Sequence, residues 1–233
     1  MTYIFSDYDG TIKTYEKNPS IIEQLTFNKN IKAINDFINR GNKFIITTGR
    51  SYKSILAETK KYHINYNYIT TYNGLVSYDD KGNLIYQKNI NKEILNEIRQ
   101  LILNYKIGTV LYDNYDITNI YENIIVMKIY TKDKYIYETL KKEIKKYTDL
   151  NITFDNLFKT ITLHVITNKS LGIKELIKDE NVENPKIITV GDSLNDIEMI
   201  KDYNGYKILI SHPKLLFKNI KTTPSLHSLI KKQ

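Results

Sequence analysis

The chain has 233 residues, a formal net charge of +8 at pH 7 and an isoelectric point near 9.2. This length allows one large domain, or a core with a smaller insertion, that buries its apolar residues without cross-links. The absence of cysteine excludes disulfides and thiolate metal sites. The histidines are scattered along the sequence, which argues against a zinc site: His63, His164, His212 and His227.

No segment has the run of about 18 apolar residues that spans a bilayer, and residues 1–7 lack the basic and apolar regions of a secretory signal. We therefore expect a soluble, cytoplasmic protein with no membrane partner. The positive charge is compatible with nucleic acid as a binding partner. The lysines, however, are dispersed rather than gathered on one element, so we do not expect such a partner. A positive field would also attract small phosphorylated molecules.

The first seventy residues alternate between predicted strands and helices. Ile31, Ile34, Phe37 and Ile38 share one face of a helix, and Gly41 fits the position after its end. In chain order we predict a strand at 3–6, a helix at 30–40, a strand at 43–47, a helix at 51–62 and a strand at 67–70. Such alternation is typical of a parallel sheet covered by helices.

The pattern changes after residue 74. Two short apolar runs, 75–78 and 83–87, flank an Asp-Asp-Lys-Gly turn and predict a hairpin. We then predict a helix at 92–105, a strand at 124–130, a helix at 133–147 and a strand at 160–166. This mixture predicts an α+β domain inserted at residues 78–165.

The alternation resumes beyond the insertion. We predict a helix at 171–178, an apolar strand at 186–190, a short helix at 196–200 and a last strand at 206–210. The predicted fold class is therefore α/β, with a Rossmann-like parallel sheet in a core domain of residues 1–77 and 166–233.

Two carboxylates, Asp7 and Asp9, follow the first strand in the sequence Asp7-Tyr8-Asp9-Gly10-Thr11. Acids at this spacing repel each other, and a fold tolerates them best when a cation or a substrate binds both. Gly10 permits a sharp turn, and Thr11 offers donors to an anion. The simpler alternative is an Asp-Gly turn at the end of a strand.

Two further motifs are candidates for binding phosphate. Thr48-Gly49-Arg50-Ser51 follows the strand at 43–47 and presents a hydroxyl and backbone N–H groups at the start of a helix. Lys169 precedes another predicted helix and could offer a point charge to phosphate, although most single lysines are only solvated.

A fourth motif, Gly191-Asp192-Ser193-Leu194-Asn195-Asp196, follows the strand at 186–190. Asp196 would also serve as an ordinary helix N-cap. Ligands bind at the carboxyl ends of the strands in open parallel sheets, so all four motifs can converge on one crevice.

In this order, the four motifs resemble those of the haloacid dehalogenase (HAD) superfamily. The insertion, with Thr71-Tyr72-Asn73-Gly74 before it, resembles the Cof-like class IIB group of phosphatases, in which the inserted domain is a cap. The chain departs from that group at 201–233, where the group carries a longer segment rich in small residues. The resemblance therefore does not predict the arrangement of the final strand and helices.

The resemblance implies that Asp7 is a nucleophile that forms an aspartyl-phosphate and that Asp9 is the general acid and base. It also implies Mg²⁺ as cofactor. Magnesium prefers oxygen ligands, which suits Asp7, the backbone carbonyl of Asp9 and Asp192. Because an aspartate is ionised at neutral pH, Asp7 would need no base to activate it.

The residues expected to surround the phosphate are Gly10, Thr11, Thr48, Gly49, Lys169 and Asn195. Asn195 and Asp196 would orient Lys169 or waters on the metal. Arg50 either reaches anions of the substrate or pairs with a core carboxylate, and Asn73 either approaches the substrate or only forms an Asn-Gly turn.

The function expected from the resemblance is Mg²⁺-dependent hydrolysis of a small phosphomonoester, such as a sugar phosphate or a phosphoglycolate-like acid. A phosphosugar mutase, a phosphatase of nucleotides or nucleic-acid ends, and a non-catalytic Mg²⁺-binding module are the alternatives. The tyrosines and acids of residues 112–116 could contact a polyol, although such tyrosines more often belong to a core.

Overall fold

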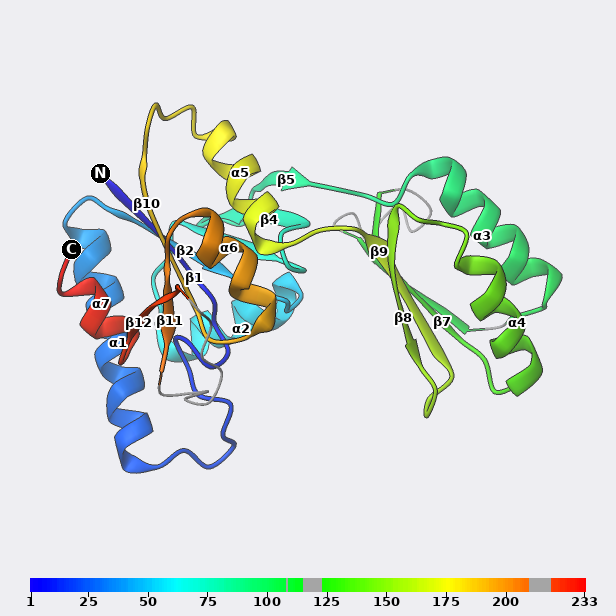
Figure 1. Ribbon diagram of the computed structural model, residues 1–233, viewed down its shortest axis with the longest axis horizontal. Helices are drawn as coiled ribbons and strands as arrows, with labels where there is room; N and C mark the ends of the chain where they lie inside the picture. Colours follow the sequence, from blue (N-terminus) through cyan, green and yellow to red (C-terminus); the bar gives the residue numbers. More distant parts are fainter. Residues whose placement is uncertain (108, 115–122, 210–218) are drawn as a thin grey trace. The chain divides into compact units, whose positions relative to one another are not determined.

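The computed structural model describes residues 1–107, 109–114, 123–209 and 219–233 (Figure 1). The chain divides into two compact units. The first unit contains Met1–Tyr86 and Asn168–Gln233, and the second contains Gln87–Thr167.

The first unit is built on a sheet of eight strands. These are β1 (Thr2–Ser6), β2 (Lys43–Thr47), β3 (Tyr68–Thr71), β4 (Val76–Asp79), β5 (Leu84–Gln87), β10 (Lys186–Gly191), β11 (Tyr206–Ile208) and β12 (Lys221–Thr223). Their order across the sheet is β12-β11-β10-β1-β2-β3-β4-β5. All neighbours from β12 to β3 run parallel, and β4 returns antiparallel to β3. The parallel sheet confirms the predicted fold class.

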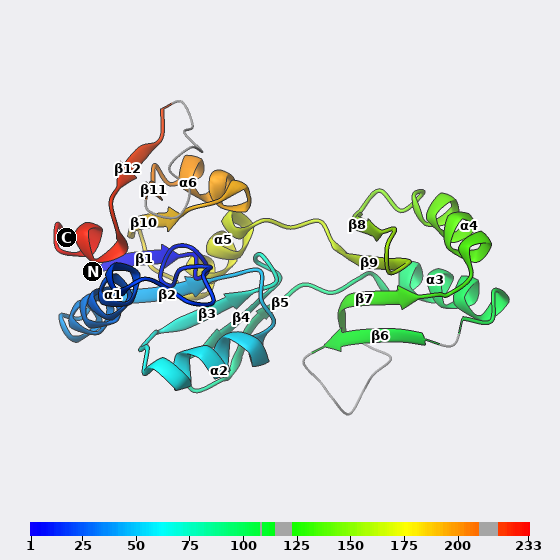
Figure 2. The same ribbon diagram turned by 90° about the horizontal axis from the view of Figure 1, so that it is seen from below.

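Helices cover both faces of this sheet (Figure 2). They are α1 (Ile21–Asn39), α2 (Tyr52–Tyr62), α5 (Lys169–Asp179), α6 (Ile197–Asp202) and α7 (Leu226–Ile230), with a 3₁₀ turn at Leu194–Asp196 before α6. One core packs α1, α2 and α7 on one face, and a second core packs α5 and α6 on the other. Because β1, β2 and β10 are covered on both sides, they appear in the sequence as continuous apolar runs.

Helix α1 begins at Ile21 rather than at residue 30. Ser20 caps it: its side chain accepts a hydrogen bond from the Glu23 backbone N–H, and the Glu23 carboxylate accepts one from the Ser20 N–H at 2.8 Å. The apolar residues of these first turns, Ile21, Ile22 and Leu25, are exposed. Apolar periodicity therefore predicts only the second half of the helix.

The second unit has a four-stranded antiparallel sheet in the order β6-β7-β9-β8. Its elements are β6 (Thr109–Asn114), β7 (Ile124–Tyr130), β8 (Leu150–Asp155), β9 (Thr160–Val165), α3 (Lys92–Asn104) and α4 (Lys134–Ile144). The two helices pack on one face of the sheet and form its core (Figure 1). Strands β6 and β8 are additions to the predicted elements.

The second unit begins at Gln87, whereas the predicted insertion begins at residue 78. The difference arises because β4 pairs with β3, from Tyr68 opposite Asp79 to Thr71 opposite Val76, and β5 follows β4 at the edge of the same sheet. The predicted hairpin therefore belongs to the first unit.

The end of the chain returns to the first unit, where β12 lies beside β11 and α7 packs on α1. The Asn30 side chain on α1 accepts a hydrogen bond from the His227 backbone N–H at 2.9 Å. The last strand we predicted, 206–210, corresponds to β11, and residue 210 lies outside the described residues.

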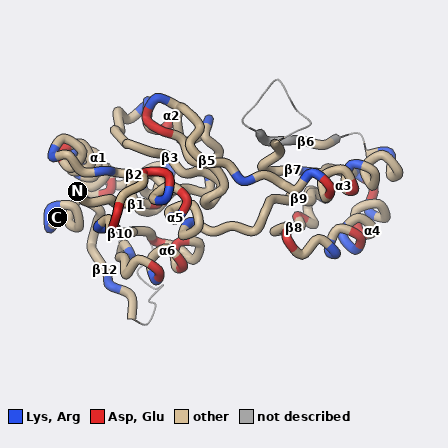
Figure 3. The backbone as a smooth tube through the Cα atoms, turned by 90° about the horizontal axis from the view of Figure 1, so that it is seen from above, with Lys and Arg blue, Asp and Glu red and all other residues tan. Residues whose placement is uncertain are grey.

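Charged residues are distributed over several elements of each unit (Figure 3). Among the described residues, no helix is both long and apolar enough to cross a membrane.

Candidate active site

The register of three parallel strands brings the predicted motifs to one edge of the first sheet. Ser6 of β1 pairs with Val190 of β10 on one side and with Ile46 of β2 on the other. The residues that follow these strands therefore leave the sheet together. This edge joins Asp7, Thr48 and Asp192, which are distant in the sequence.

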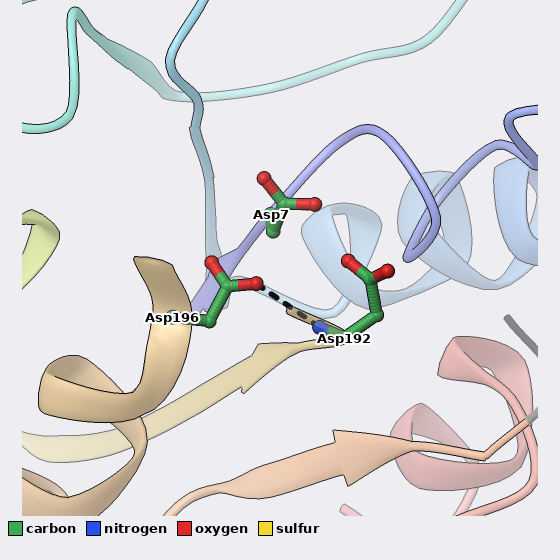
Figure 4. Close-up of side chains that lie close together, drawn as sticks. All are labelled: Asp7, Asp192 and Asp196. Atoms are coloured by element: carbon green, nitrogen blue, oxygen red, sulfur yellow. Dashed lines mark hydrogen bonds between the residues drawn. The ribbon is translucent and has the colours of Figure 1, made fainter. Parts of the chain in front are cut away.

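Three buried carboxylates, Asp7, Asp192 and Asp196, gather at this edge, and we call them the carboxylate cluster (Figure 4). One ligand oxygen from each lies within 4.8 Å of the others. Asp7 is 5 % exposed, and the other two are fully buried. Three anionic groups this close in a buried site repel one another, so the cluster needs positive charge nearby.

Asp196 folds the loop after β10. Its Oδ2 accepts hydrogen bonds from the backbone N–H of Asp192 at 3.1 Å, drawn in Figure 4, and from the backbone N–H of Ser193 at 3.0 Å. The Ser193 hydroxyl donates to the same oxygen at 3.1 Å. Both carboxylate oxygens of Asp196 thus accept hydrogen bonds from the protein, since Oδ1 accepts one from Lys169.

Lys169, at the start of α5, is fully buried between two of these acids. Its Nζ donates to Asp7 Oδ1 at 2.5 Å and to Asp196 Oδ1 at 2.7 Å. Burial raises the pKa of Asp7, Lys169 opposes this rise, and Asp196 adds to it. Burial lowers the pKa of Lys169, but its two carboxylate partners give a net rise. Lys169 is therefore a fixed cation beside Asp7.

Arg50 forms an ion pair with Asp9, one of the two alternatives considered for this arginine. Its Nε donates to Asp9 Oδ2 at 2.7 Å, and its Nη2 donates to Asp9 Oδ1 at 2.6 Å. The guanidinium carbon lies 5.2 Å from the centre of the Tyr8 ring. The Tyr8 hydroxyl donates to Glu58 at 2.8 Å, and Lys13 donates to the same Glu58 oxygen at 2.5 Å. This network holds Arg50 where its guanidinium makes two hydrogen bonds to one carboxylate.

The other predicted phosphate residues lie around the same edge. Thr48 is buried, and its hydroxyl accepts from the Arg50 backbone N–H at 3.2 Å. The Thr11 hydroxyl donates to Asp192 Oδ1 at 3.4 Å. A Cβ on Gly49 would lie 3.2 Å from the side-chain oxygen of Asn73, which also accepts from Asn195 at 3.4 Å. Asn73 is thus both a turn residue with φ of 53° and a neighbour of two predicted site residues.

Tyr15 is a neighbour of the site that the sequence did not predict. Its hydroxyl donates to Asp192 Oδ1 at 3.5 Å. Burial raises the pKa of Tyr15, and the negative charges of Asp192 and Asp7 add to this rise. Tyr15 lies in a loop between β1 and α1 without apolar periodicity, so no signal in the sequence places it here.

A cavity of about 710 Å³ opens beside Asp9 and Arg50, entirely within the first unit. This volume lies within the usual range for small-molecule sites. Its wall comes from the loop after β1, the start of α1 and the end of α2, and includes Thr14, Tyr15, Gln24, Asn28, Lys61 and Tyr62.

Gly10 has a φ of +83°, and a Cβ there would collide with the Asp192 carboxylate and lie 2.5 Å from the Tyr15 ring. We expect Gly10→Ala to lower stability by about 1–3 kcal/mol, because of left-handed backbone strain and this clash. Urea unfolding measures the loss. Gly41→Ala is the matched control, since Gly41 has a φ of +80° and a Cβ added there would have nothing within 4 Å. Equal losses of unfolding free energy in both variants would show that the clash of the added Cβ with Asp192 does not contribute to the effect of Gly10→Ala.

The possible metal-ligand atoms of the carboxylate cluster are all oxygens, which suits a hard divalent cation such as Mg²⁺. Asp196 is occupied by its hydrogen bonds, which leaves Asp7 and Asp192 as the side chains best placed to bind a metal. A cation there would act on Asp7 in the same direction as Lys169 and favour its ionised form.

The model of a family described as haloacid dehalogenase-like hydrolase matches residues 4–161 and 115–212. A candidate phosphatase of Buchnera aphidicola subsp. Baizongia pistaciae is 26% identical over 258 residues, covering 97% of this chain and 92% of that protein.

Two solved structures are similar in fold. A Thermotoga maritima protein has a TM-score of 0.76 at 14% identity, covering 100% of this chain and 97% of its own. A HAD subclass IIB sugar phosphatase has a TM-score of 0.65 at 17% identity, with the same coverage of 100% and 97%. These similarities agree with the resemblance carried by the four motifs.

Proposed function

Because the chain belongs to the haloacid dehalogenase-like hydrolases, we propose that it is a Mg²⁺-dependent phosphatase of small phosphomonoesters that forms an aspartyl-phosphate. The observation that carries this proposal is the position of Asp7. Its carboxylate is held by the buried cation Lys169, and Asp192 lies beside it in an arrangement that suits a metal.

In the first step, an Asp7 oxygen attacks phosphorus, and the bond from phosphorus to the ester oxygen of the leaving group breaks. Oδ1 of Asp7 is bonded to Lys169, so Oδ2 is the oxygen better placed to attack. Asp9 must first take up a proton and exchange one of its two bonds to Arg50 for it, and it then gives this proton to the departing oxygen. Bound Mg²⁺ would offset the negative charge of the phosphoryl group.

In the second step, a water attacks the phosphorus of the aspartyl-phosphate and loses a proton to Asp9. Phosphate leaves, and both aspartates return to their starting states. Thr48, the Gly49 N–H and Lys169 are proposed to hold the phosphoryl oxygens, as their positions at the same sheet edge support.

Arg50 is proposed to position Asp9 for both proton transfers. Arg50→Lys keeps the charge but cannot make two parallel bonds to one carboxylate, so we expect kcat/KM to fall about tenfold or more. Steady-state kinetics would measure this. Arg40→Lys, at an exposed position after α1, is the control. Wild-type kinetics in Arg50→Lys would show that the two parallel hydrogen bonds from Arg50 to Asp9 have no positioning role.

The cavity beside Asp9 is proposed to hold the leaving group, since Asp9 is the proton donor to that group. Its wall offers hydroxyl and amide groups of Thr14, Tyr15, Gln24 and Asn28, which suit the hydroxyls of a sugar. A sugar phosphate is therefore our preferred substrate class, as the similarity to a sugar phosphatase also suggests. We further propose that residues 87–167 are the cap domain of this family.

The test is a screen of sugar phosphates, phosphoglycolate and nucleotides for released phosphate, with Mg²⁺ and with EDTA. We expect release from at least one sugar phosphate that stops in EDTA and in Asp192→Asn. Glu198→Gln, an exposed acid on α6, should keep full activity. Release that is equal with and without metal would refute the Mg²⁺ requirement. Transfer to a sugar without phosphate release would identify a mutase, and release from nucleotides alone would change the substrate class.

A further inference from the structure

A glutamate outside the four motifs, Glu58 on helix α2, binds both ends of the loop that carries Asp9. The Tyr8 hydroxyl donates to Glu58 Oε2 at 2.8 Å, and Lys13 Nζ donates to the same oxygen at 2.5 Å. Tyr8 is fully buried, and the Glu58 side chain is 21 % exposed. Burial raises the pKa of Glu58, but the hydrogen bonds from Lys13 and Tyr8 give a net fall, so this side chain is anionic at neutral pH.

The loop between Tyr8 and Lys13 is closed by its own backbone. The Tyr8 carbonyl accepts hydrogen bonds from the N–H groups of Ile12 and Lys13, each at 3.0 Å. Asp9 lies inside this closed loop, so the position of Asp9 depends on where the loop is fixed. Glu58 fixes the loop at both of its ends.

Arg50 holds the same loop in a second way, through its two hydrogen bonds to Asp9. The two attachments support each other, since the Arg50 guanidinium also lies 5.2 Å from the centre of the Tyr8 ring. They behave differently in the proposed reaction. Arg50 loses one of its bonds to Asp9, whereas the bonds to Glu58 involve none of the reacting atoms. Glu58 therefore still holds the loop while Asp9 acts.

We propose that Glu58 is a positioning residue for Asp9, because its bonds to Tyr8 and Lys13 keep the Asp9 carboxyl within reach of the departing ester oxygen. The inference rests on the proposed function in one respect, that Asp9 protonates this oxygen as its bond to phosphorus breaks. Movement of the loop by about 1 Å would slow that proton transfer, since general acid catalysis requires hydrogen-bond distance.

Asp7 has contacts of its own that do not pass through Glu58. Its backbone N–H donates to the Val190 carbonyl at 2.9 Å, and its carboxylate accepts from Lys169. Loss of Glu58 should therefore slow protonation of the leaving group more than attack on phosphorus. A substrate whose leaving group departs without a proton separates these two effects.

Glu58→Ala tests the inference with two substrates, 4-nitrophenyl phosphate and the sugar phosphate that the wild type hydrolyses fastest. A 4-nitrophenolate departs without a proton, whereas a sugar alkoxide needs one. We expect kcat/KM for the sugar phosphate to fall about tenfold or more, and kcat/KM for 4-nitrophenyl phosphate to change less than about twofold. A loss of folded protein would lower both values equally. Glu58→Gln keeps an acceptor oxygen for Tyr8 and should lose less than Glu58→Ala.

Tyr8→Phe is the second variant, because it removes one bond to Glu58 and keeps the ring beside Arg50. It should show the same selective loss, of about threefold or more, and it carries the test if Glu58→Ala does not fold. Glu97→Ala is the matched control, since Glu97 also accepts hydrogen bonds from a tyrosine and a lysine, within the second unit. It should leave both values of kcat/KM unchanged.

In either variant, equal losses for the two substrates or an unchanged kcat/KM for the sugar phosphate would overturn the inference. Asp9→Asn is the reference, and it should lose hydrolysis of the sugar phosphate far more than hydrolysis of 4-nitrophenyl phosphate. The proposed function fails separately. The wild type would then release phosphate from neither substrate, or Asp9→Asn would lose both activities equally, and either result removes the general acid on which the inference depends.

Discussion

Asp7→Asn should lower the rate of phosphate release by about a thousandfold or more, because an amide is a very poor nucleophile toward phosphorus. The variant should keep its fold, since asparagine has nearly the same shape and its side-chain oxygen can still accept the Lys169 hydrogen bond. Phosphate release on the best substrate, with circular dichroism of the same samples, measures both effects.

Asp36→Asn is the matched control for this experiment, because it makes the same change at an exposed position of α1. It should leave turnover unchanged. If Asp7→Asn kept even a few per cent of wild-type activity while folded, Asp7 would not be the nucleophile, and a water activated at the cluster would be the better account.

Lys169→Met should be the most destabilising of the substitutions considered. It removes the ammonium that Asp7 and Asp196 share and leaves buried carboxylates without their partner, a change that typically costs about 3–5 kcal/mol. Urea unfolding in EDTA measures this loss. Mg²⁺ should recover part of it, since a cation beside Asp7 replaces some of the missing charge. Activity should be lost even with Mg²⁺, because Lys169 is also expected to contact the phosphoryl group.

Lys174→Met is the control for Lys169→Met, because it removes a lysine from an exposed position of the same helix, α5. It should change the free energy of unfolding by less than about 0.5 kcal/mol. A similar small change for Lys169→Met would mean that the two ion pairs contribute little to stability.

Much of the fold was predictable from local patterns, because its central strands are buried on both faces and leave continuous apolar runs. β8 carries a clear alternation, Leu150-Asn151-Ile152-Thr153-Phe154-Asp155, so it was predictable by the same rule although we did not predict it. β12, with the sequence Lys-Thr-Thr, has no apolar residue, so only its pairing with β11 makes it a strand.

The candidate site, like the fold, was predictable from the sequence only in part. The sequence by itself determined which chemistry is available, since the four motifs follow or begin regular elements and supply carboxylates, donors and a lysine in a recognisable order. It could not decide between the two partners considered for Arg50, and it gave Lys169 a phosphate and Asp196, but not Asp7, as its neighbours.

Only the tertiary structure decided the partners. Arg50 meets Asp9 across 41 residues because β1 and β2 are parallel and end at the same edge of one sheet, whereas Lys169 meets Asp7 across 162 residues from the start of helix α5. Tyr15 approaches Asp192 from a loop that no motif marks. Periodicity in a sequence records which side of an element is buried, but the register between strands decides which charges meet.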